Sequence, residues 1–284
     1  MAEKKIQLLD GAMGTQIWAR TGEHKPVWIY NIENPEVVKE VHRAYIEAGA
    51  DIILTNTFGA NRHATAKGCS YSVAEVVSAG VSIARQAAKG TAVKVALDIG
   101  PLLDLLEPYG DLTEEDATDI FTEQIGAGMN GEEKPDMIVL ETFMDLEMMK
   151  VAVKVAKSYG VPVLSLMTFE QAGRTLMGQS VEDVAHALSS LGVDALGMNC
   201  SLGPDTALPI IASFREHTTL PLVLKPNAGK PIVGKGGAVT FPTSPSDFAK
   251  DIEAAFPYVD FVGGCCGTDA EYIKMLRDKI NQYD

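Results

Sequence analysis

The sequence of 284 residues contains few cysteines, an excess of acidic over basic residues and no long apolar run. Four cysteines are too few for a disulfide scaffold in a chain of this length, so we expect a reducing, cytoplasmic location. The 24 basic and 38 acidic residues give a net charge of −14, which argues against nucleic acid or an anionic membrane as a partner. No apolar run approaches the roughly 18 residues of a membrane span, and no signal-peptide pattern follows Met1.

Short runs rich in Val, Ile and Leu recur along the whole chain, and most are apolar on consecutive residues. Strands of this kind are buried on both faces, as is typical of parallel sheets. The sequence therefore predicts eight parallel strands, at Ile6–Asp10, Asp51–Thr55, Val93–Asp98, Met137–Glu141, Val161–Met167, Ala195–Cys200, Leu222–Lys225 and Phe261–Cys265.

Helix signals lie between these runs. Pro35 follows Asn34 at the start of an apolar stripe that Gly49 ends. Thr113 and Ser180 each precede acidic residues in the pattern of a helix cap. This alternation predicts a single (β/α)8 TIM-type barrel over residues 1–284, with an open doubly wound sheet as the alternative. The Gly- and Pro-rich stretch Asn227–Pro245 follows the seventh strand, so we interpret it as an active-site loop.

Cysteines mark the carboxyl ends of two predicted strands, where the chemistry of a barrel gathers. Cys265 ends the last predicted strand, Cys266 follows it, glycines flank the pair, and Cys200 ends the sixth strand. If the barrel closes, the three thiolates could converge on one soft metal ion, with zinc as the leading candidate. Buried apolar cysteines and a vicinal redox disulfide remain open as alternatives. Cys69 lies away from the strand ends and is interpreted as structural.

Two carboxylates also end predicted strands. Asp10 and Glu141 would point into the mouth of the barrel, where they could bind an ammonium group or act as acid and base. The backbone amides of Gly11 and Ala12 could hold a carboxylate. A plain Asp-Gly turn is the alternative for Asp10, and an ion pair with a neighbouring cation is the alternative for Glu141.

The five histidines show no spacing that indicates a set of metal ligands. His42 and His186 fall within predicted helices, and we interpret both as surface residues.

Four segments together resemble one known family: Leu9–Thr15, Glu141–Thr142, Gly197–Pro204 and Gly263–Thr268. Their combination, and above all the paired cysteines with an upstream Asn-Cys, resembles the homocysteine S-methyltransferase family over essentially the whole chain. The opening motif is most similar to the homocysteine-binding module of cobalamin-dependent methionine synthase.

The resemblance implies a (β/α)8 barrel that carries catalytic zinc on three sulfurs, those of Cys200, Cys265 and Cys266. It implies that Asp10 and Glu141 hold the amino group of L-homocysteine and that the backbone of Gly11 and Ala12 takes its carboxylate. Thr57 and Asn199 are expected to line the same pocket. The implied reaction moves a methyl group to the homocysteine sulfur and gives L-methionine.

The motif resemblance favours a methylated corrinoid as the donor. The chain as given has no segment left to bind cobalamin or folate, so we expect methylcobalamin to arrive on a separate corrinoid protein. S-methylmethionine, S-adenosylmethionine and betaine are the alternative donors. Trp18 and Trp28 could cover a cationic donor, or they could simply pack in the core. Two further alternatives are a non-catalytic barrel that binds homocysteine or zinc, and a barrel enzyme that uses its carboxylates without a metal.

Overall fold

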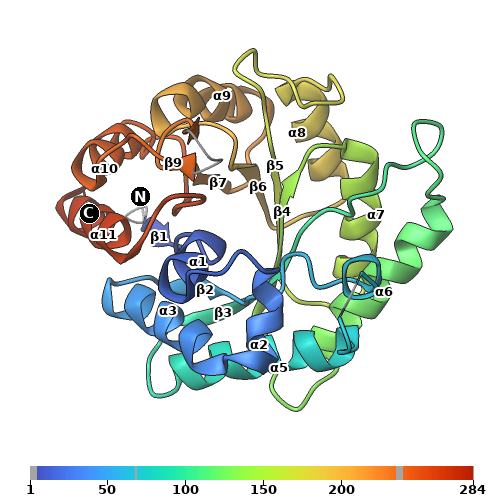
Figure 1. Ribbon diagram of the computed structural model, residues 1–284. Coiled ribbons are helices and arrows are strands. Elements are labelled where there is room, and N and C mark those ends of the chain that lie inside the picture. The colour runs from blue at the N-terminus through green and yellow to red at the C-terminus, as the bar shows by residue number, and fades with distance from the viewer. Residues whose placement is uncertain (1–4, 68, 235–238, 284) are drawn as a thin grey trace.

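The computed structural model describes residues 5–67, 69–234 and 239–283. Parallel strands form its centre, and helices surround them (Figure 1). The central strands are β1 (Gln7–Leu8), β2 (Ile52–Leu54), β3 (Lys94–Ile99), β4 (Met137–Phe143), β5 (Val163–Met167), β6 (Ala195–Asn199), β7 (Leu222–Lys225) and β10 (Phe261–Val262). The surrounding helices are α3 (Pro35–Glu47), α5 (Val73–Ala88), α6 (Glu114–Met129), α7 (Leu146–Lys157), α8 (Val181–Ser190), α9 (Pro204–His217), α10 (Pro245–Glu253) and α11 (Ala270–Tyr283).

The strands close into a ring. Their order is β1-β10-β7-β6-β5-β4-β3-β2, and every neighbouring pair is parallel. A parallel bridge between Leu9 and Ile52 joins the two ends of this order, and the amide of Asp51 donates to the Leu8 carbonyl at 2.7 Å. The predicted (β/α)8 barrel is therefore confirmed, and the open sheet is excluded.

Local signals in the sequence set the helix ends. Ser180 caps α8 in a capping box with Asp183, and the Thr113 side chain accepts from the Asp116 amide at the start of α6. Pro35 opens α3 as predicted. Gly160 follows α7 with φ +69°, a left-handed conformation that glycine adopts without strain.

The core has two layers. Ten buried side chains, among them Leu54, Val139 and Leu166, fill the inside of the barrel. A larger cluster lies between the strands and the outer helices. Because the strands are covered on both faces, they are apolar on consecutive residues, and they give the rim a rigid base.

His42 is buried, so its interpretation as a surface residue is wrong. It lies within α3 at 0% exposure, on the face that packs against the barrel, and neither ring nitrogen has a hydrogen-bond partner among the described residues. Burial lowers the pKa of His42 from 6.5 to about 3, because a charged imidazole is poorly solvated there.

This burial makes the stability of the fold sensitive to acid. Below pH 6.5 the unfolded chain protonates His42 and the folded chain does not, so the free energy of unfolding falls until the pH approaches the folded pKa of about 3. Between pH 6.5 and 5.5 we expect a loss of up to about 1.4 kcal/mol from this residue. Urea unfolding with a chelator should show that His42→Leu removes this part of the acid sensitivity, while His24→Leu, at an exposed histidine, keeps it. Equal acid sensitivity in His42→Leu and the parent would contradict the assignment.

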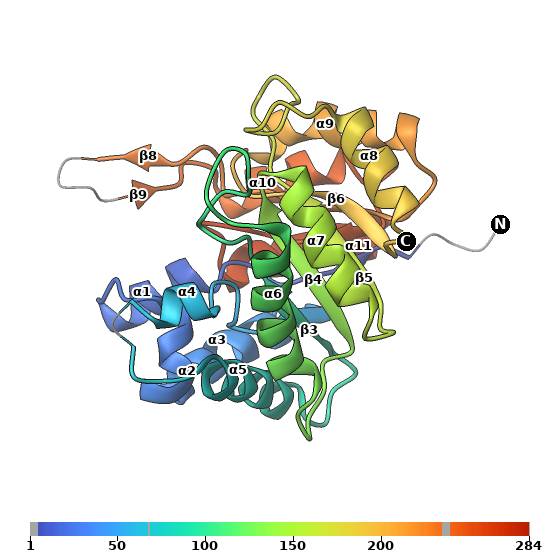
Figure 2. The ribbon, with the colours of Figure 1, turned by 90° about the vertical axis from the view of Figure 1, so that its right-hand side faces the viewer.

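Additional elements lie in the segments that follow barrel strands. They are α1 (Gly14–Thr21), the 3-10 helix η1 (Val27–Ile29), α2 (Tyr30–Glu33), α4 (Arg62–Thr65) and a hairpin of β8 (Ile232–Val233) and β9 (Val239–Thr240). Figure 2 shows the hairpin projecting from the same side of the barrel as α1 and α4. The predicted active-site loop Asn227–Pro245 contains this hairpin, and its residues 235–238 lie outside the described residues. Among the described helices, none combines the length and the apolar character needed to span a membrane.

Candidate active site

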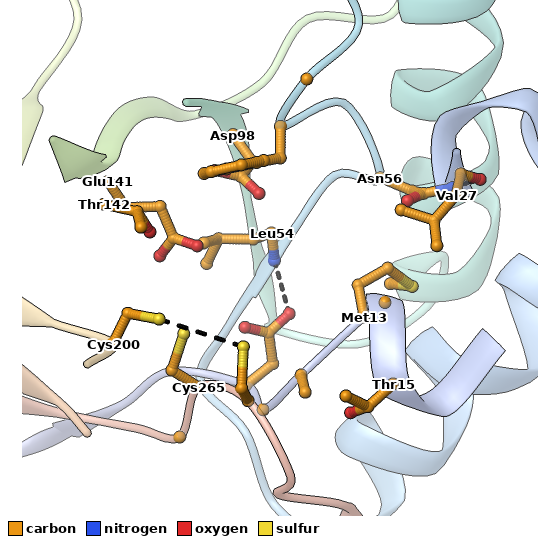
Figure 3. Close-up of a pocket in the computed structure, with 18 of the residues that line it drawn as sticks. Met13, Thr15, Val27, Leu54, Asn56, Asp98, Glu141, Thr142, Cys200 and Cys265 are labelled. Carbon is orange, nitrogen blue, oxygen red and sulfur yellow. Dashed lines mark hydrogen bonds between the residues drawn. The ribbon is translucent and has the colours of Figure 1, made fainter. Parts of the chain in front are cut away.

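A cavity of about 400 Å³ opens at the carboxyl ends of the barrel strands. The segments after β1 and β2 line one side of it. The floor is formed by the loop after β10 together with Asp98 of β3, Glu141 and Thr142 of β4, Cys200 after β6 and Lys225 of β7. Side chains of Asp98, Glu141, Cys200 and Cys265 turn toward this one space (Figure 3). The rim position predicted for the site is therefore where the cavity lies.

Three cysteines converge in the cavity. The sulfur atoms of Cys200, Cys265 and Cys266 all lie within 4.8 Å of one another, and those of Cys200 and Cys266 are 4.0 Å apart. None of the four cysteines, all within the described residues, forms a disulfide, so the vicinal disulfide is not present. The contact with Cys200, together with burial, raises the pKa of Cys265, because neighbouring thiolates would repel one another in a buried site. Three thiols this close, and unpaired in a disulfide, form a donor set that suits a soft divalent cation such as zinc.

Strand β7 brings the cysteines together. It lies between β6 and β10 in the barrel, and both neighbouring loops are hydrogen-bonded to its end. The amide of Cys200 donates to the Lys225 carbonyl at 3.1 Å, and that of Cys265 donates to the Pro226 carbonyl at 2.8 Å. Cys200 has φ 58°, a left-handed conformation that is rare outside glycine and is typical of functional sites.

A buried lysine joins the two predicted carboxylates. The Nζ of Lys225 lies 2.8 Å from Glu141 Oε2 and 3.9 Å from Asp10 Oδ1, and the lysine side chain is 2% exposed. The ion-pair alternative for Glu141 is thus present inside the candidate site. The lysine was missed in the sequence, although it ends a strand whose other residues are all apolar. Burial raises the pKa of Asp10 to about 7 even though Lys225 and the Leu54 amide lower it.

A third carboxylate, Asp98, also lines the cavity and was missed. Burial, followed by the charge of Glu141, raises the pKa of Asp98. Its Oδ1 is buried without a hydrogen-bond partner among the described residues, and so is Oδ1 of Asp10, whose Oδ2 accepts from the Leu54 amide at 2.7 Å. The sequence feature that could have identified Asp98 was its position at the end of the third predicted strand. Three carboxylates around one ammonium group leave the floor of the cavity suited to a second cationic group.

The loop after β1 is held tightly against the loop after β10. Tyr45 Oη donates to the Ala12 carbonyl at 2.6 Å, and the Ala12 amide donates to Thr268 Oγ1 at 3.1 Å. A Cβ on Gly11 would lie 2.7 Å from Thr268 Oγ1 and 2.8 Å from Tyr45 Oη, so only glycine fits there. Gly11 and Ala12 both line the cavity as expected, but the Ala12 amide already has an acceptor in Thr268 Oγ1.

Thr57 and Asn199 are placed differently from the expectation that they line the pocket. Neither is among the residues that line the cavity. Thr57 Oγ1 donates to the Asp98 carbonyl at 2.7 Å. Asn199 Oδ1 accepts from the Thr142 amide at 2.7 Å, and its Nδ2 lies 3.8 Å from Cys265 Sγ. Both side chains are fully buried and bind backbone groups, so they support the lining residues from behind.

The two tryptophans lie at the wall of the cavity. Trp18 and Trp28 both line it, and Trp28 is 5% exposed and also belongs to the core. Trp18 Nε1 donates to the Lys25 carbonyl at 2.8 Å. Trp28 thus both packs in the core and lines the cavity.

The rim around the cavity carries exposed apolar side chains. Among the described residues, every exposed large apolar side chain except Tyr283 lies between a barrel strand and the helix that follows it. These side chains are Leu103, Leu105, Tyr109, Met144, Leu176, Ile232, Val233 and Val239. The segments that carry them all follow the carboxyl ends of barrel strands, the end at which the cavity opens.

The fold and the site define a TIM-barrel protein with a three-thiol cluster beside a pocket of carboxylates. A family model described as homocysteine S-methyltransferase matches residues 7–280. The chain belongs to the homocysteine S-methyltransferase family.

Individual relatives agree with this assignment. The chain is 30% identical to the methionine synthases of Mycobacterium leprae and Mycobacterium tuberculosis, over 98% of its own length. It spans about a quarter of the length of these relatives, 24% and 25% respectively. Its fold is similar to crystal structures of the homocysteine methyltransferase MmuM from Escherichia coli. The metallated form has a TM-score of 0.80 and the apo form 0.74, each at 23% identity over 98% of this chain and 97% of the other.

Proposed function

We propose that this barrel transfers a methyl group to the sulfur of L-homocysteine and gives L-methionine, with zinc at Cys200, Cys265 and Cys266. The donor in this proposal is a methylated corrinoid on a separate protein. The observation that carries the proposal is the convergence of three sulfur atoms within 4.8 Å beside a buried set of carboxylates. Membership of the family supports homocysteine as the acceptor.

The three cysteines would hold the metal by their Sγ atoms. When bound, zinc supplies the positive charge that keeps a thiol ionised near neutral pH, where a free thiol with a pKa of about 8.5 is mostly protonated. The chain provides the positioning. Asn199 contacts Cys265, and the hydrogen bonds to β7 fix the backbones of both cysteine loops. The three sulfur atoms would therefore need little rearrangement to bind one metal ion.

The carboxylates would orient the acceptor. Glu141 Oε2 is taken by Lys225, and Asp10 Oδ2 is taken by the Leu54 amide, so one oxygen of each is held in place. The second oxygen of each remains to accept from the substrate ammonium group. The substrate carboxylate would lie against the backbone of Gly11 and Ala12, where the loop is held by Tyr45 and Thr268. Because the Ala12 amide already donates to Thr268 Oγ1, the donor to the carboxylate would be the Gly11 amide. Anchoring both polar ends aims the substrate sulfur at the cysteine cluster.

The reaction is a displacement at a methyl carbon. The thiol first loses its proton to solvent, and an electron pair of the resulting sulfur forms the new bond to carbon. The bond between the methyl group and the donor breaks, and its electrons leave with the donor. No side chain of the protein has to move a proton during this transfer, which fits a site whose carboxylates are engaged in binding.

A donor carried by another protein fits the rim. A corrinoid ring exceeds the cavity of about 400 Å³, so it would have to approach from outside. The apolar side chains of the β8–β9 hairpin, with Ile232 at 53% and Val233 at 72% exposure, lie on the side from which it would come. Apolar contacts of this kind are typical of docking surfaces between proteins.

The test of the proposal is a set of donor assays. Zinc-loaded protein with homocysteine should form methionine from methylcobalamin, free or on a corrinoid protein. S-methylmethionine, S-adenosylmethionine and betaine serve as competing donors, and a clear preference for one of them would replace the corrinoid in the proposal. Homocysteine binding without methionine from any donor would refute catalysis.

Glu141→Gln should weaken homocysteine binding. A charge-assisted hydrogen bond contributes about 1.5–3 kcal/mol, so we expect KM for homocysteine to rise about 10- to 100-fold. The zinc content should stay unchanged, because Glu141 lies outside the sulfur cluster. Initial rates at varied homocysteine measure this, with Glu147→Gln on the exposed side of α7 as the control. An unchanged KM would remove Glu141 from the pocket.

A double variant of the hairpin separates docking from chemistry. Ile232→Ser with Val233→Ser should lower kcat/KM for a protein-borne donor at least about fivefold, since each apolar side chain buried at an interface contributes on the order of 1 kcal/mol. The rate with free methylcobalamin should not change, because neither residue lines the cavity. An equal loss with both donors would show that the hairpin acts on the site itself.

A further inference from the structure

A second group of metal-ligating side chains lies outside the barrel. Potential ligand atoms of Glu182, His186 and His217 all lie within 4.8 Å of one another. Glu182 and His186 are four residues apart on α8, so they share one face of that helix. His217 is the last residue of α9, which packs beside α8. The histidine rings have centroids 6.0 Å apart at an interplanar angle of 89°. The sequence spacing gave no sign of this set, because the third ligand comes from another helix.

These three side chains are not engaged elsewhere. In the part of the chain that the structure describes, no side-chain hydrogen bond or ion pair involves Glu182, His186 or His217. The adjacent carboxylate of Asp183 is taken by the Ser180 cap. The one arginine in the last turn of α9, Arg215, turns toward the Tyr258 carbonyl and Asp260 instead. Among the described residues, no lysine or arginine forms an ion pair with Glu182, and the charge of Arg174 acts on the adjacent Asp183.

We propose that Glu182, His186 and His217 form a second metal site, which binds a divalent transition ion such as Zn²⁺, Ni²⁺ or Co²⁺ and links α8 to α9. Two imidazoles and one carboxylate are a ligand set that such ions favour, whereas Mg²⁺ and Ca²⁺ prefer oxygen alone. A tetrahedral ion with bonds of about 2.0 Å needs ligand atoms roughly 3.3 Å apart. Glu182 and His186 are exposed, so their side chains can turn the remaining ångström or so.

The C-terminus of α9 favours a cation. His217 ends a helix of 14 residues, and the carbonyl groups at a helix C-terminus carry partial negative charge. Glu182 adds a full negative charge on the facing helix. The site differs from the cysteine cluster in chemistry, since it contains no sulfur, and its ligands come from elements that leave the catalytic cavity untouched.

The site is tested in protein whose cysteine cluster is disabled. Calorimetric titration of the Cys265→Ser variant of this chain with Zn²⁺ or Ni²⁺ should show one equivalent per chain. Adding His186→Ala or His217→Ala should weaken this binding at least tenfold, while adding His63→Ala, at a histidine paired with Asp104, should leave it unchanged. With Co²⁺, the remaining site should give visible bands without the intense sulfur-to-metal absorption of thiolate ligands. Binding that survives both histidine substitutions would overturn the proposal.

The outcome is independent of the catalytic proposal. His186→Ala in the otherwise unaltered chain should keep methyl transfer and reduce bound zinc from two equivalents to one. A parent protein that binds one equivalent, with no change on His186→Ala or His217→Ala, would also overturn the second site. Loss of the cysteine-bound ion alone would instead count against the proposed function.

Discussion

Cys265→Ser is expected to abolish zinc binding at the cavity and methyl transfer together while the barrel stays folded. A serine hydroxyl matches the thiol in shape but is a poor ligand for a soft cation. Losing the ion removes several kcal/mol of stabilisation from the transition state, so activity should fall at least about 100-fold. The side chain contacts Asn199 and the other two cysteines, and Cys265 is not among the residues of the two apolar core clusters.

Metal analysis, circular dichroism and initial rates on one preparation measure these effects. Because the second proposed site would bind zinc as well, the analysis should use protein that also carries His186→Ala. The matched control is Cys69→Ser, since Cys69 Sγ accepts from the Tyr71 amide, donates to the Tyr71 carbonyl and lies outside the cluster. Full methyl transfer by a Cys265→Ser protein without zinc would refute the ligand assignment.

Lys225→Met should be the most destabilising single change at the site. It leaves Glu141 and Asp10 as buried carboxylates without their cation, and breaking a buried ion pair costs about 3–5 kcal/mol. Urea unfolding near pH 8 measures the loss. Lys154→Met, at an exposed lysine paired with Glu114, should change stability by less than about 1 kcal/mol.

The pH dependence distinguishes lost charge from lost packing. Burial already raises the pKa of Asp10 to about 7 with Lys225 in place, and removing the cation raises it further. A carboxyl group whose folded pKa lies above its unfolded value destabilises the fold as pH rises through that range. Acidification from pH 8 toward 5 should therefore restore stability to Lys225→Met, by up to about 1.4 kcal/mol per pH unit from Asp10. Lys225→Arg keeps the charge and should lose less stability. Equal losses at pH 8 and 5 would point to packing alone.

Most strands and several helix starts of the barrel could be predicted from the sequence, because the patterns that indicate them lie within short segments. Strands buried on both faces are apolar on consecutive residues, and the predicted strand Leu222–Lys225 agrees with β7 to the residue. Ser180 and Thr113 satisfy amides within three residues, so the starts of α8 and α6 were predictable as well. His42 was misplaced because its helix is covered by neighbouring elements that its own sequence does not reveal.

Some residues of the candidate site could likewise be predicted from the sequence, and others could not. Asp10, Glu141 and the three cysteines could be identified because each ends a predicted strand or, for Cys266, directly follows one. The family resemblance then implied their roles. Lys225 and Asp98 also end strands, but their part in the site depends on which strands face one another across the ring. Asn199 supports the cavity lining through its hydrogen bond with the amide of Thr142, which is 57 residues away in the sequence.

The sequence by itself determined the strands, the helix caps and the family, since these rest on patterns within short segments. The tertiary structure alone decided which charges meet. The ammonium group of Lys225 lies between carboxylates from two other strands, and the imidazole of His217 lies beside a different helix. Such contacts join side chains far apart along the chain, and they form only when barrel closure and helix packing fix the distances between whole elements.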